Sequence, residues 1–272
     1  MKISKFKLAL YGKYLFLIII SFLSIFPLFW MFVSATNASV DVLAGTLLPG
    51  VQLKENLTKL LANTNLLRAL WNSFKYAAAA TILSLFVSSL AGYGFEIYHD
   101  KGKDILMNIL LLSMMVPFAV IMVPLYMMFG NANLLNSTAG FVLPTISTAF
   151  LIFLFRQSSR NFPREIIEAA RLEGLTEFGI FFRMYIPVMK STYAAAAVIT
   201  FMNAWNNYLW PLIIMQKPEA QTMPLLISNL TSGYVIDYGV LMLAVAISVI
   251  PTILIFLALQ KNFAEGIVGS AK

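Results

Sequence analysis

The residues best suited to a specific interaction are Glu168, Ala169, Ala170 and Gly174, in a charged stretch between two long apolar runs. Pro163 precedes them, and proline is favoured at the first position of a helix. Gly174 is placed to adopt the left-handed conformation that commonly ends a helix. The spacing therefore predicts a short helix that is closed by a glycine.

Charged residues give this predicted helix one polar face. Arg164, Glu168 and Arg171 are spaced at i, i+4 and i+7, and ion pairs along that face stabilise a helix by roughly 0.2–0.5 kcal/mol each. Ala169 and Ala170 are small, so they let a second protein approach closely. The residues allow two interpretations: a surface on which a soluble partner docks, or an amphipathic helix that rests on lipid headgroups.

A second polar set lies inside an apolar run. Asn203, Asn206 and Asn207 are spaced at i, i+3 and i+4, which predicts one shared face of a helix. Amide side chains are costly in lipid unless they are paired or face water. Trp205 and Trp210 flank them, and amides with aromatic rings suit the hydroxyls and C–H faces of a sugar. The same residues also fit hydrogen bonding between packed helices, so both interpretations stay open.

Small side chains recur at every fourth position of another apolar run, at Ala80, Ser84, Ser88 and Gly92. A stripe of small residues lets a neighbouring helix come close. This pattern predicts helix packing rather than a binding site.

The composition indicates that lipid is the main solvent. Of the 272 residues, 60% are hydrophobic and 11% are charged, whereas soluble domains carry about 25% charged residues. Cysteine is absent and His99 is the single histidine, which excludes a disulfide framework and argues against a metal site. Gly45–Gly50 approaches a phosphate-binding loop, but Val51 follows where a lysine is required. We therefore expect no metal and no cofactor on this chain.

Six apolar segments are each near the roughly 20 residues that cross a bilayer as a helix. They cover residues 14–34, 71–95, 105–129, 138–155, 187–215 and 238–260. The first segment exceeds the 7–15 apolar residues of a signal-peptide core, so we expect it to be retained as a span, with cleavage as the alternative.

Lysine and arginine predict the orientation, because they gather on the cytoplasmic side of membrane proteins. With the N-terminus in the cytoplasm, 14 of the 19 basic residues lie on the cytoplasmic side and 4 on the opposite side. Both termini and residues 161–186 are then cytoplasmic. This asymmetry accounts for the net charge of +7 without a nucleic-acid partner.

The charged stretch closely resembles the cytoplasmic loop of ATP-binding-cassette (ABC) importer permeases. The shared pattern is Glu-Ala-Ala, three residues, glycine, nine residues, and then a hydrophobic–x–hydrophobic–proline ending. In this chain it reads Glu168-Ala169-Ala170, Gly174, Met184, Ile186 and Pro187. Methionine and isoleucine stand where isoleucine and leucine are usual, and both are mild apolar departures.

Further stretches are similar to carbohydrate permeases of the MalG type. They are residues 203–212, Met223-Pro224-Leu225, Asp237-Tyr238-Gly239 and Gln260-Lys261-Asn262-Phe263. The resemblance covers most of the chain. It implies an all-α membrane protein with the fold of type I ABC importer permeases, in which residues 1–272 form one domain of six transmembrane helices. A coupling helix would lie between spans four and five, in a coupling loop over residues 161–186.

The resemblance also implies partners and roles for individual residues. The partners would be a second homologous permease, two cytoplasmic ATPase subunits that carry ATP and magnesium, an extracytoplasmic solute-binding protein and the lipid bilayer. The location would be the bacterial cytoplasmic membrane. The residues expected to couple to the ATPase are Glu168, Ala169, Ala170, Arg171, Glu173 and Gly174. Those expected along the substrate pathway are Asn203, Trp205, Asn206 and Asn207, and those expected to contact the binding protein are Thr222, Met223, Pro224 and Gly233.

These expectations describe a non-enzymatic permease subunit of an importer for a di- or oligosaccharide, with hydrolysis carried out by a partner. A polyamine or a peptide is the alternative cargo, although the spans lack the acidic residues expected for a cation. A membrane-embedded enzyme would need an intramembrane catalytic set, and the spans offer none. A channel or secondary transporter is the remaining class, and inverted repeats or intramembrane charges would favour it.

Overall fold

The computed structural model describes residues 2–269, with the surroundings of side chains described for residues 10–260. Every regular element in that part is a helix. The described chain separates into two compact units. Unit 1 holds the residues up to Leu66 together with Leu226–Ile250, and unit 2 holds Leu67–Leu225 together with the residues from Pro251 on. The single domain over residues 1–272 therefore stays a prediction.

Unit 1 is built from α1 (Lys2–Ser34), α2 (Ser39–Leu43), α3 (Leu53–Asn63) and the first part of α15 (Tyr238–Gly269). Two buried asparagines organise its loops. Asn56 donates through Nδ2 to the carbonyl oxygens of Ala35 and Asn37, both at 3.0 Å, and Asn37 donates to the carbonyl oxygen of Leu48 at 3.0 Å. A Cβ at Gly239 would lie 2.5 Å from the Asn37 carbonyl oxygen, so a glycine is needed where α15 begins.

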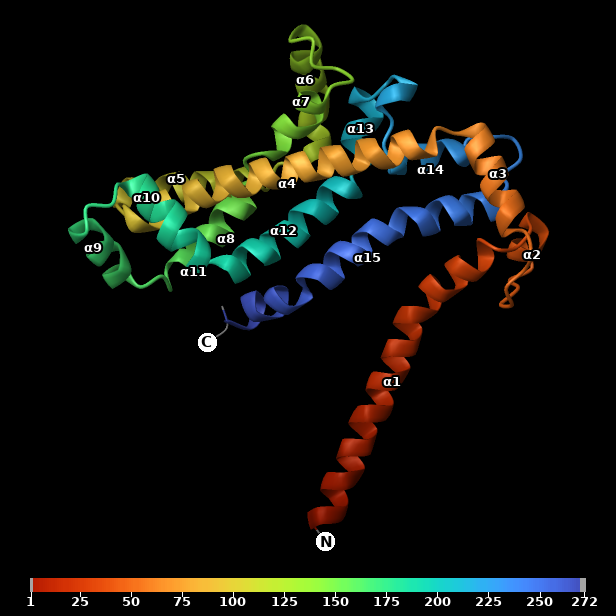
Figure 1. Cartoon of the computed structure of the whole chain (residues 1–272), viewed down its shortest axis with the longest axis horizontal. Helices are drawn as coiled ribbons and strands as arrows, with labels where there is room; N and C mark the ends of the chain where they lie inside the picture. Colours follow the sequence, from red (N-terminus) through yellow and green to blue (C-terminus); the bar gives the residue numbers. More distant parts are fainter. Residues whose placement is uncertain (1, 270–272) are drawn as a thin grey trace. The chain divides into compact units, whose positions relative to one another are not determined.

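Unit 2 contains the remaining helices. They are α4 (Leu66–Ile97), α5 (Lys101–Ser113), α6 (Phe118–Asn131), α7 (Thr138–Val142), η1 (Leu143–Thr145), α8 (Ala149–Ser159), α9 (Arg164–Leu172), α10 (Glu177–Ile180), the π-helix η2 (Phe181–Tyr185), α11 (Ile186–Val188), α12 (Lys190–Trp205), α13 (Leu209–Ile214) and η3 (Pro218–Ala220). The last helix before α15 is α14 (Met223–Leu230), which both units share. Figure 1 shows α8 and α12 running alongside the long helix α4.

The small-residue stripe of α4 packs as the sequence predicts. Ala80, Ser84 and Ser88 are fully buried, and the Ser84 hydroxyl donates to the carbonyl oxygen of Thr145 at 2.7 Å. At Gly92, an added Cβ would lie 2.6 Å from Cβ of Phe155 on α8. The backbones of α4 and α8 therefore approach as closely as a glycine permits.

A bulky side chain at Gly92 should force α4 and α8 apart. We expect Gly92→Leu to lower the thermal stability of the purified protein, because overpacking a tight contact costs about 1–3 kcal/mol or more. Gly94→Leu, two residues along the same helix, is the matched control, since a Cβ there meets nothing within 4 Å. The measurement is the midpoint of thermal unfolding in detergent, and equal midpoints for the two variants would contradict the close contact.

A buried arginine joins α4, α5 and α8 near their ends. Arg156 is 5% exposed, its Nε lies 3.5 Å from a Glu96 carboxylate oxygen, and its guanidinium also pairs with Asp104. A buried charge is tolerated when it is paired and hydrogen-bonded. The two carboxylates meet this need and place the three helices in one bundle.

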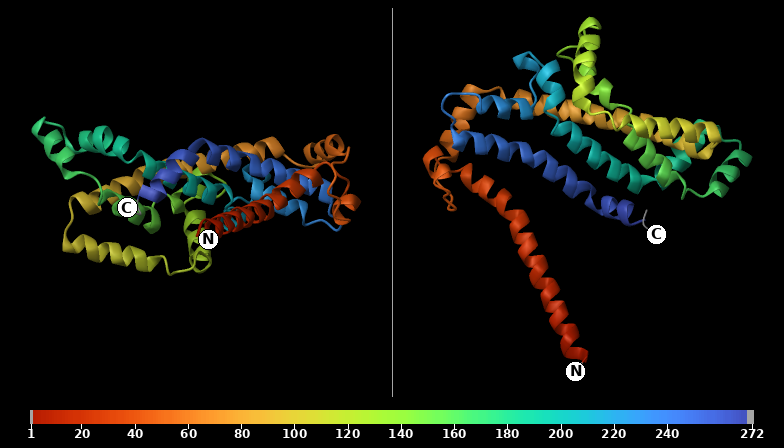
Figure 2. Two further views of the ribbon diagram at one scale, coloured as in Figure 1. Left: turned by 90° about the horizontal axis from the view of Figure 1, so that it is seen from below. Right: turned by 180° about the vertical axis from the view of Figure 1, so that it is seen from behind.

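The described chain contains three to five candidate spans. Leu10–Ser34, Leu66–Ile97 and Tyr238–Gln260 are each long and apolar enough to cross a membrane as single helices. Two further candidates are bent pairs: α5 with α6 at 96°, and the α7–η1 segment with α8 at 50°. Figure 2 shows α6 standing at a steep angle to α5. The described residues therefore give fewer candidates than the six predicted spans, and the number six stays a prediction.

The breaks in the predicted spans have local causes that a count of apolar residues does not detect. The predicted third span, residues 105–129, breaks after Ser113, and Pro117, which has extended backbone, directly precedes α6. The predicted fourth span bends before Ala149, and α8 then continues to Ser159. In the predicted fifth span, residues 187–215, α12 ends at Trp205 after 16 residues. Asparagine side chains compete for backbone groups there, as described below.

Candidate functional site

The predicted short helix is present as α9. It begins at Arg164, directly after Pro163, and ends at Leu172. Gly174 follows with φ +81°, a left-handed conformation that side chains other than glycine rarely adopt. A Cβ on Gly174 would meet nothing within 4 Å, so the backbone conformation rather than a close contact requires glycine. We call residues 161–186 the α9 loop.

One face of α9 is buried in an aromatic cluster. Ile167 and Ala170 are each 3% exposed. They pack with residues from α4, α10, the π-helix and the segments just before α9 and just after α11, namely Tyr93, Ile180, Phe181, Tyr185, Phe162 and Met189. Ala170 therefore supports the helix from inside, and its expected coupling role stays a prediction.

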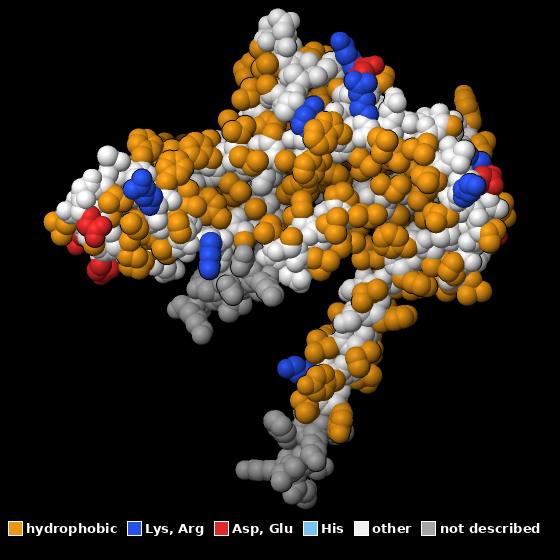
Figure 3. All heavy atoms as spheres, in the orientation of Figure 1, with side chains coloured by type: hydrophobic (Ala, Val, Ile, Leu, Met, Phe, Trp, Pro, Cys, Tyr) orange, Lys and Arg blue, Asp and Glu red, His pale blue; other side chains and the backbone are white. Residues whose placement is uncertain are grey.

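The opposite face of α9 is open. Glu168, Ala169, Glu173 and Gly174 are exposed, as a docking surface requires. Leu172 is 91% exposed and lies four residues after Glu168, on the same helical face. Sequence reasoning missed Leu172, although a lone apolar residue on a polar face was a signal that could have identified it. Figure 3 shows acidic and basic side chains at the end of unit 2 that carries α9 and α10.

Arg171 is placed differently from the expectation. Instead of pairing along α9, its Nε donates to Glu177 Oε1 of α10 at 2.7 Å. The other Glu177 oxygen accepts from the hydroxyl of Tyr98, which directly follows α4. Arg171 is 44% exposed, so this ion pair lies at the surface, and the expected coupling role of Arg171 stays a prediction.

The three asparagines of the second polar set do not share one helix. Asn203 is on α12, Asn206 caps its end and Asn207 lies in the break before α13. Asn206 Nδ2 donates to the carbonyl oxygen of Met202 at 3.0 Å, and Asn207 Oδ1 accepts from the Trp210 backbone N–H at 3.4 Å. These local bonds favour the break, because they replace helical ones.

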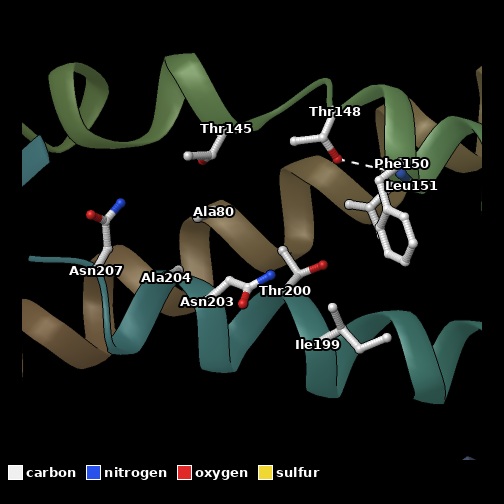
Figure 4. A pocket seen from close by; sticks show the side chains of 10 residues that line it. All are labelled: Ala80, Thr145, Thr148, Phe150, Leu151, Ile199, Thr200, Asn203, Ala204 and Asn207. Atoms are coloured by element: carbon white, nitrogen blue, oxygen red, sulfur yellow. Dashed lines mark hydrogen bonds between the residues drawn. The ribbon is translucent and has the colours of Figure 1, made fainter. Parts of the chain in front are cut away.

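The break nevertheless brings the amides to a common pocket. A cavity of about 290 Å³ is lined by Asn203 and Asn207 on one side and by Thr145 and Thr148 on the other. Figure 4 shows the two threonines facing Asn203 and Thr200 across it. Thr200 is 9% exposed, and its hydroxyl has no hydrogen-bond partner among the described residues. The pocket thus contains a hydroxyl that is available to hydrogen-bond a bound molecule.

An adjoining cavity of about 510 Å³ adds aromatic walls. It shares Asn203 and Asn207 with the first and is also lined by Asn206, Phe118, Tyr208 and Trp210. No acidic or basic side chain is among the lining residues of either cavity. We call the two together the polar pocket. The arrangement offers amides, hydroxyls and ring faces to an uncharged polar molecule.

Trp205 does not belong to this pocket. It is 2% exposed and stacks on Phe201, with ring centroids 5.7 Å apart. A residue at this position of α12 points into the packed side, and the predicted place of Trp205 on the pathway stays untested. Trp210, which the sequence analysis named only as flanking the asparagines, lines the pocket. Its Nε1 donates to the carbonyl oxygen of Gly140 at 3.0 Å.

The segment before α14 is anchored rather than free. Thr222 and Met223 are buried, and the Met223 N–H donates to Ser73 Oγ of α4 at 2.7 Å. Asn72 Nδ2 also donates to the carbonyl oxygens of Glu219 and Gln221, at 2.8 and 3.0 Å. Thr222 and Met223 therefore offer little exposed surface, and their expected contact roles stay a prediction.

Gly233 lies in an exposed turn together with Tyr234 and Val235, and Pro224 is half-buried. Both side chains of the turn are open to solvent, with Val235 90% exposed. Sequence reasoning named Gly233 but missed its two apolar neighbours. An exposed aromatic residue beside a glycine was the available signal.

Comparison with known proteins identifies the family. Residues 84–268 match the model of the family described as the binding-protein-dependent transport system inner membrane component. The chain belongs to this family. It is therefore an inner-membrane, multi-pass permease of a bacterial ABC transporter and not itself an enzyme, and permeases of this family bind no cofactor.

Curated relatives extend the match over nearly the whole permease. The lactose transport system permease protein LacG of Rhizobium radiobacter is 45% identical over 96% of this chain and 95% of the relative. The arabinooligosaccharides transport system permease protein AraQ of Bacillus subtilis (strain 168) is 37% identical over 95% and 94%. The sn-glycerol-3-phosphate transport system permease protein UgpE of Escherichia coli (strain K12) is 33% identical over 91% and 92%.

A solved structure shares the fold of the permease. It is a chain of a bacterial ABC transporter involved in the import of the acidic polysaccharide alginate, with a TM-score of 0.82, 19% identity and coverage of 94% of this chain and 97% of that one. The permease is thus an all-helical membrane protein with an ABC importer permease fold, of the MalG-like carbohydrate type. Membership of a binding-protein-dependent ABC transporter implies an ATPase and a binding protein as partners.

Proposed function

We propose that this permease imports a neutral di- or oligosaccharide, and that the polar pocket lines part of the path. The observation that carries this proposal is the chemistry of the pocket lining. It combines amides, hydroxyls and aromatic rings with no acidic or basic side chain. Ring faces pack against the C–H groups of a sugar, while amides and hydroxyls bond its hydroxyl groups.

The lining argues against charged cargo. A phosphate ester is best held by arginine or lysine, and a polyamine by carboxylates, because an unpaired charge in a dry site is expensive. Two of the relatives named above transport neutral sugars and one transports a phosphate ester. The lining supports a cargo like that of the first two. A charged solute such as a polyamine, or a peptide, remains the alternative cargo.

The α9 loop is the proposed seat of a cytoplasmic ATPase subunit. Glu168, Ala169, Glu173 and Gly174 would form the contact, and Leu172 would insert an apolar side chain into the partner. Exposure of these residues and their location in the recognised sequence pattern support this role. Ala170 would support this contact from the buried side of α9, and the 44% exposed Arg171 would hold α9 to α10 through its ion pair with Glu177.

The mechanism we propose is alternating access. Two ATPase subunits close on ATP, carry the α9 loop of this permease and of a second homologous permease with them, and switch the spans between inward-facing and outward-facing states. Such transitions need rigid elements between two discrete arrangements. The α9 loop meets that need, since its aromatic cluster ties it to α4 and Tyr185 hydrogen-bonds Ser159 of α8 at 2.7 Å.

We further propose that the two units act as one permease domain with six crossings and both termini in the cytoplasm. In this topology the break after Trp205 interrupts the fifth crossing. Helix α12 alone spans about 24 Å at 1.5 Å per residue, so α13 completes the crossing beyond the break. The lysine and arginine asymmetry supports this orientation.

The exposed turn at Gly233 is the proposed contact with the solute-binding protein. Tyr234 and Val235 present apolar surface there, while Pro224 borders the anchored segment. Tyrosine is well suited to protein interfaces because it combines a large ring with a polar end.

The test of cargo uses the assembled transporter in proteoliposomes. We expect ATP-dependent uptake of a neutral disaccharide or oligosaccharide that requires the binding protein, and no comparable uptake of sn-glycerol 3-phosphate or spermidine. Uptake of the phosphate ester or the polyamine at a rate equal to that of the sugars would refute the neutral-cargo assignment. Uptake without ATP would refute the importer mechanism.

A further inference from the structure

A polar clamp of Tyr98, Glu177 and Arg171 joins three parts of unit 2. Glu177 is the first residue of α10, directly after Thr176, whose hydroxyl accepts from the Gly179 N–H at 3.2 Å. The two carboxylate oxygens of Glu177 accept from different donors. Oε1 accepts from Arg171 on α9, and Oε2 accepts from the hydroxyl of Tyr98, the residue after α4. One carboxylate therefore connects α9, α10 and the end of α4.

Apolar side chains do not fill all the space beside this clamp. A cavity of about 160 Å³ lies beside the clamp, lined by Tyr98 and Glu177 together with Leu90, Tyr93, Gly94, Phe178 and Phe181. On its inner side, Tyr93 contacts Phe181 and Tyr185 edge-on, with centroid distances of 5.4 and 4.8 Å. Because the cavity leaves the outer side unfilled, the clamp is the direct connection between α10 and Tyr98 there.

The clamp stays charged under physiological conditions. Hydrogen bonds from Arg171 and then from Tyr98 hold the pKa of the Glu177 carboxyl below its usual range. A lowered carboxyl pKa means that the contribution is fully present at neutral pH and is lost only as the pH falls through that lowered value. Glu177 and Arg171 are each nearly half exposed, and exposed ion pairs contribute little to overall stability.

We propose that the clamp is a positioning device that makes the inner end of α4 move with α9 when an ATPase grips the α9 loop. This inference rests on the docking of α9 proposed above. Arg171, Glu177 and Tyr98 do not touch cargo or ATP in this proposal. They convert a displacement of the gripped helix into a displacement of a membrane span.

Breaking the clamp should lower the efficiency of transport rather than prevent assembly of the transporter. A broken clamp lets α9 move while α4 lags behind, so ATP is hydrolysed with less cargo moved. Coupling between sites is typically altered by about 0.5–2 kcal/mol in such variants, which corresponds to roughly a 2- to 30-fold change. We expect the number of ATP molecules hydrolysed per cargo molecule to rise by that factor.

The experiment compares Glu177→Gln, Tyr98→Phe and the exchange Arg171→Glu with Glu177→Arg, each in the complete transporter in proteoliposomes. Uptake and ATP hydrolysis are measured in the same sample. We expect Glu177→Gln to raise the ATP-to-cargo ratio most and Tyr98→Phe less, and the charge exchange to restore the ratio in part. Glu55→Gln is the matched control, because Glu55 pairs with Lys59 within a single helix at 2.8 Å.

Two outcomes would overturn this inference. If uptake and hydrolysis fall together in Glu177→Gln and Tyr98→Phe, so that their ratio is unchanged, the clamp does not transmit motion and the inference is overturned. If the ratio rises equally in Glu55→Gln, the effect is not specific to the clamp and the inference is also overturned. A failure of docking itself would appear as loss of ATPase association with the wild-type permease, which these ratios do not measure.

Discussion

Gly174→Val should abolish most ATP-driven uptake while leaving the membrane helices folded. Valine is β-branched, and holding it at φ +81° costs on the order of 1–3 kcal/mol. The chain can relieve that strain by changing how α9 ends, which displaces the exposed face of Glu168, Leu172 and Glu173. If the full strain energy disfavours the conformation of α9 that docks, uptake should fall roughly 5- to 150-fold.

Two companion variants make this result interpretable. Gly174→Asn should retain most uptake, because asparagine tolerates the left-handed conformation. Gly45→Val imposes the same kind of strain at φ +73°, also with nothing within 4 Å of the new Cβ, but in unit 1 and outside the α9 loop. The measurement is uptake together with copurification of the ATPase. Equal losses in Gly45→Val and Gly174→Val would show that strain alone, rather than the α9 surface, explains the defect.

Asn203→Leu should reduce uptake of a sugar without unfolding the permease. The substitution keeps a similar volume but removes an amide from the polar pocket, and a lost hydrogen bond to a buried polar partner costs about 1–3 kcal/mol. We expect uptake efficiency to fall roughly 5- to 150-fold. Asn108→Leu is the matched control, because Asn108 is exposed on α5 and lines neither cavity of the polar pocket.

Thr200→Val distinguishes cargo binding from helix packing in the same pocket. The Thr200 hydroxyl is buried without a described partner, so replacing it with a methyl group should leave stability unchanged or raise it. If the hydroxyl serves cargo, uptake falls even though the protein is no less stable. Unchanged uptake in both Thr200→Val and Asn203→Leu would remove the polar pocket from the pathway and favour a path lined by the partner permease.

Local sequence chemistry was sufficient for the α9 loop. Pro163 at the start, Gly174 at the end and the apolar spacing of Ile167 and Ala170 each act within a few residues, so the helix and its termination could be predicted. The small residues of α4 were equally informative, because only a close neighbour explains a repeat of four. The resemblance to a family added the class of partner, through a residue spacing that local backbone preferences do not require.

Side-chain partners across the fold could not be predicted in the same way. Arg171 has Glu168 in a favourable position on its own helix, yet it pairs with Glu177, because the turn at Gly174 brings α10 back toward α9. Likewise, the periodicity of residues 187–215 suggests one helix, but Asn206 and Asn207 bond to nearby backbone groups and end it. Competition between near and distant partners is decided only when the elements are packed.

The sequence by itself determined the class of protein, the membrane-compatible segments, and the helix and glycine of the α9 loop, because hydrophobicity and local backbone preference are properties of neighbouring residues. Only the tertiary structure decided that Ala170 and Trp205 face inward, that Thr222 and Met223 are anchored, and that threonines from one segment face asparagines from another. The physical reason is that burial and hydrogen bonding depend on which elements meet, and that information is distributed over residues far apart in the chain.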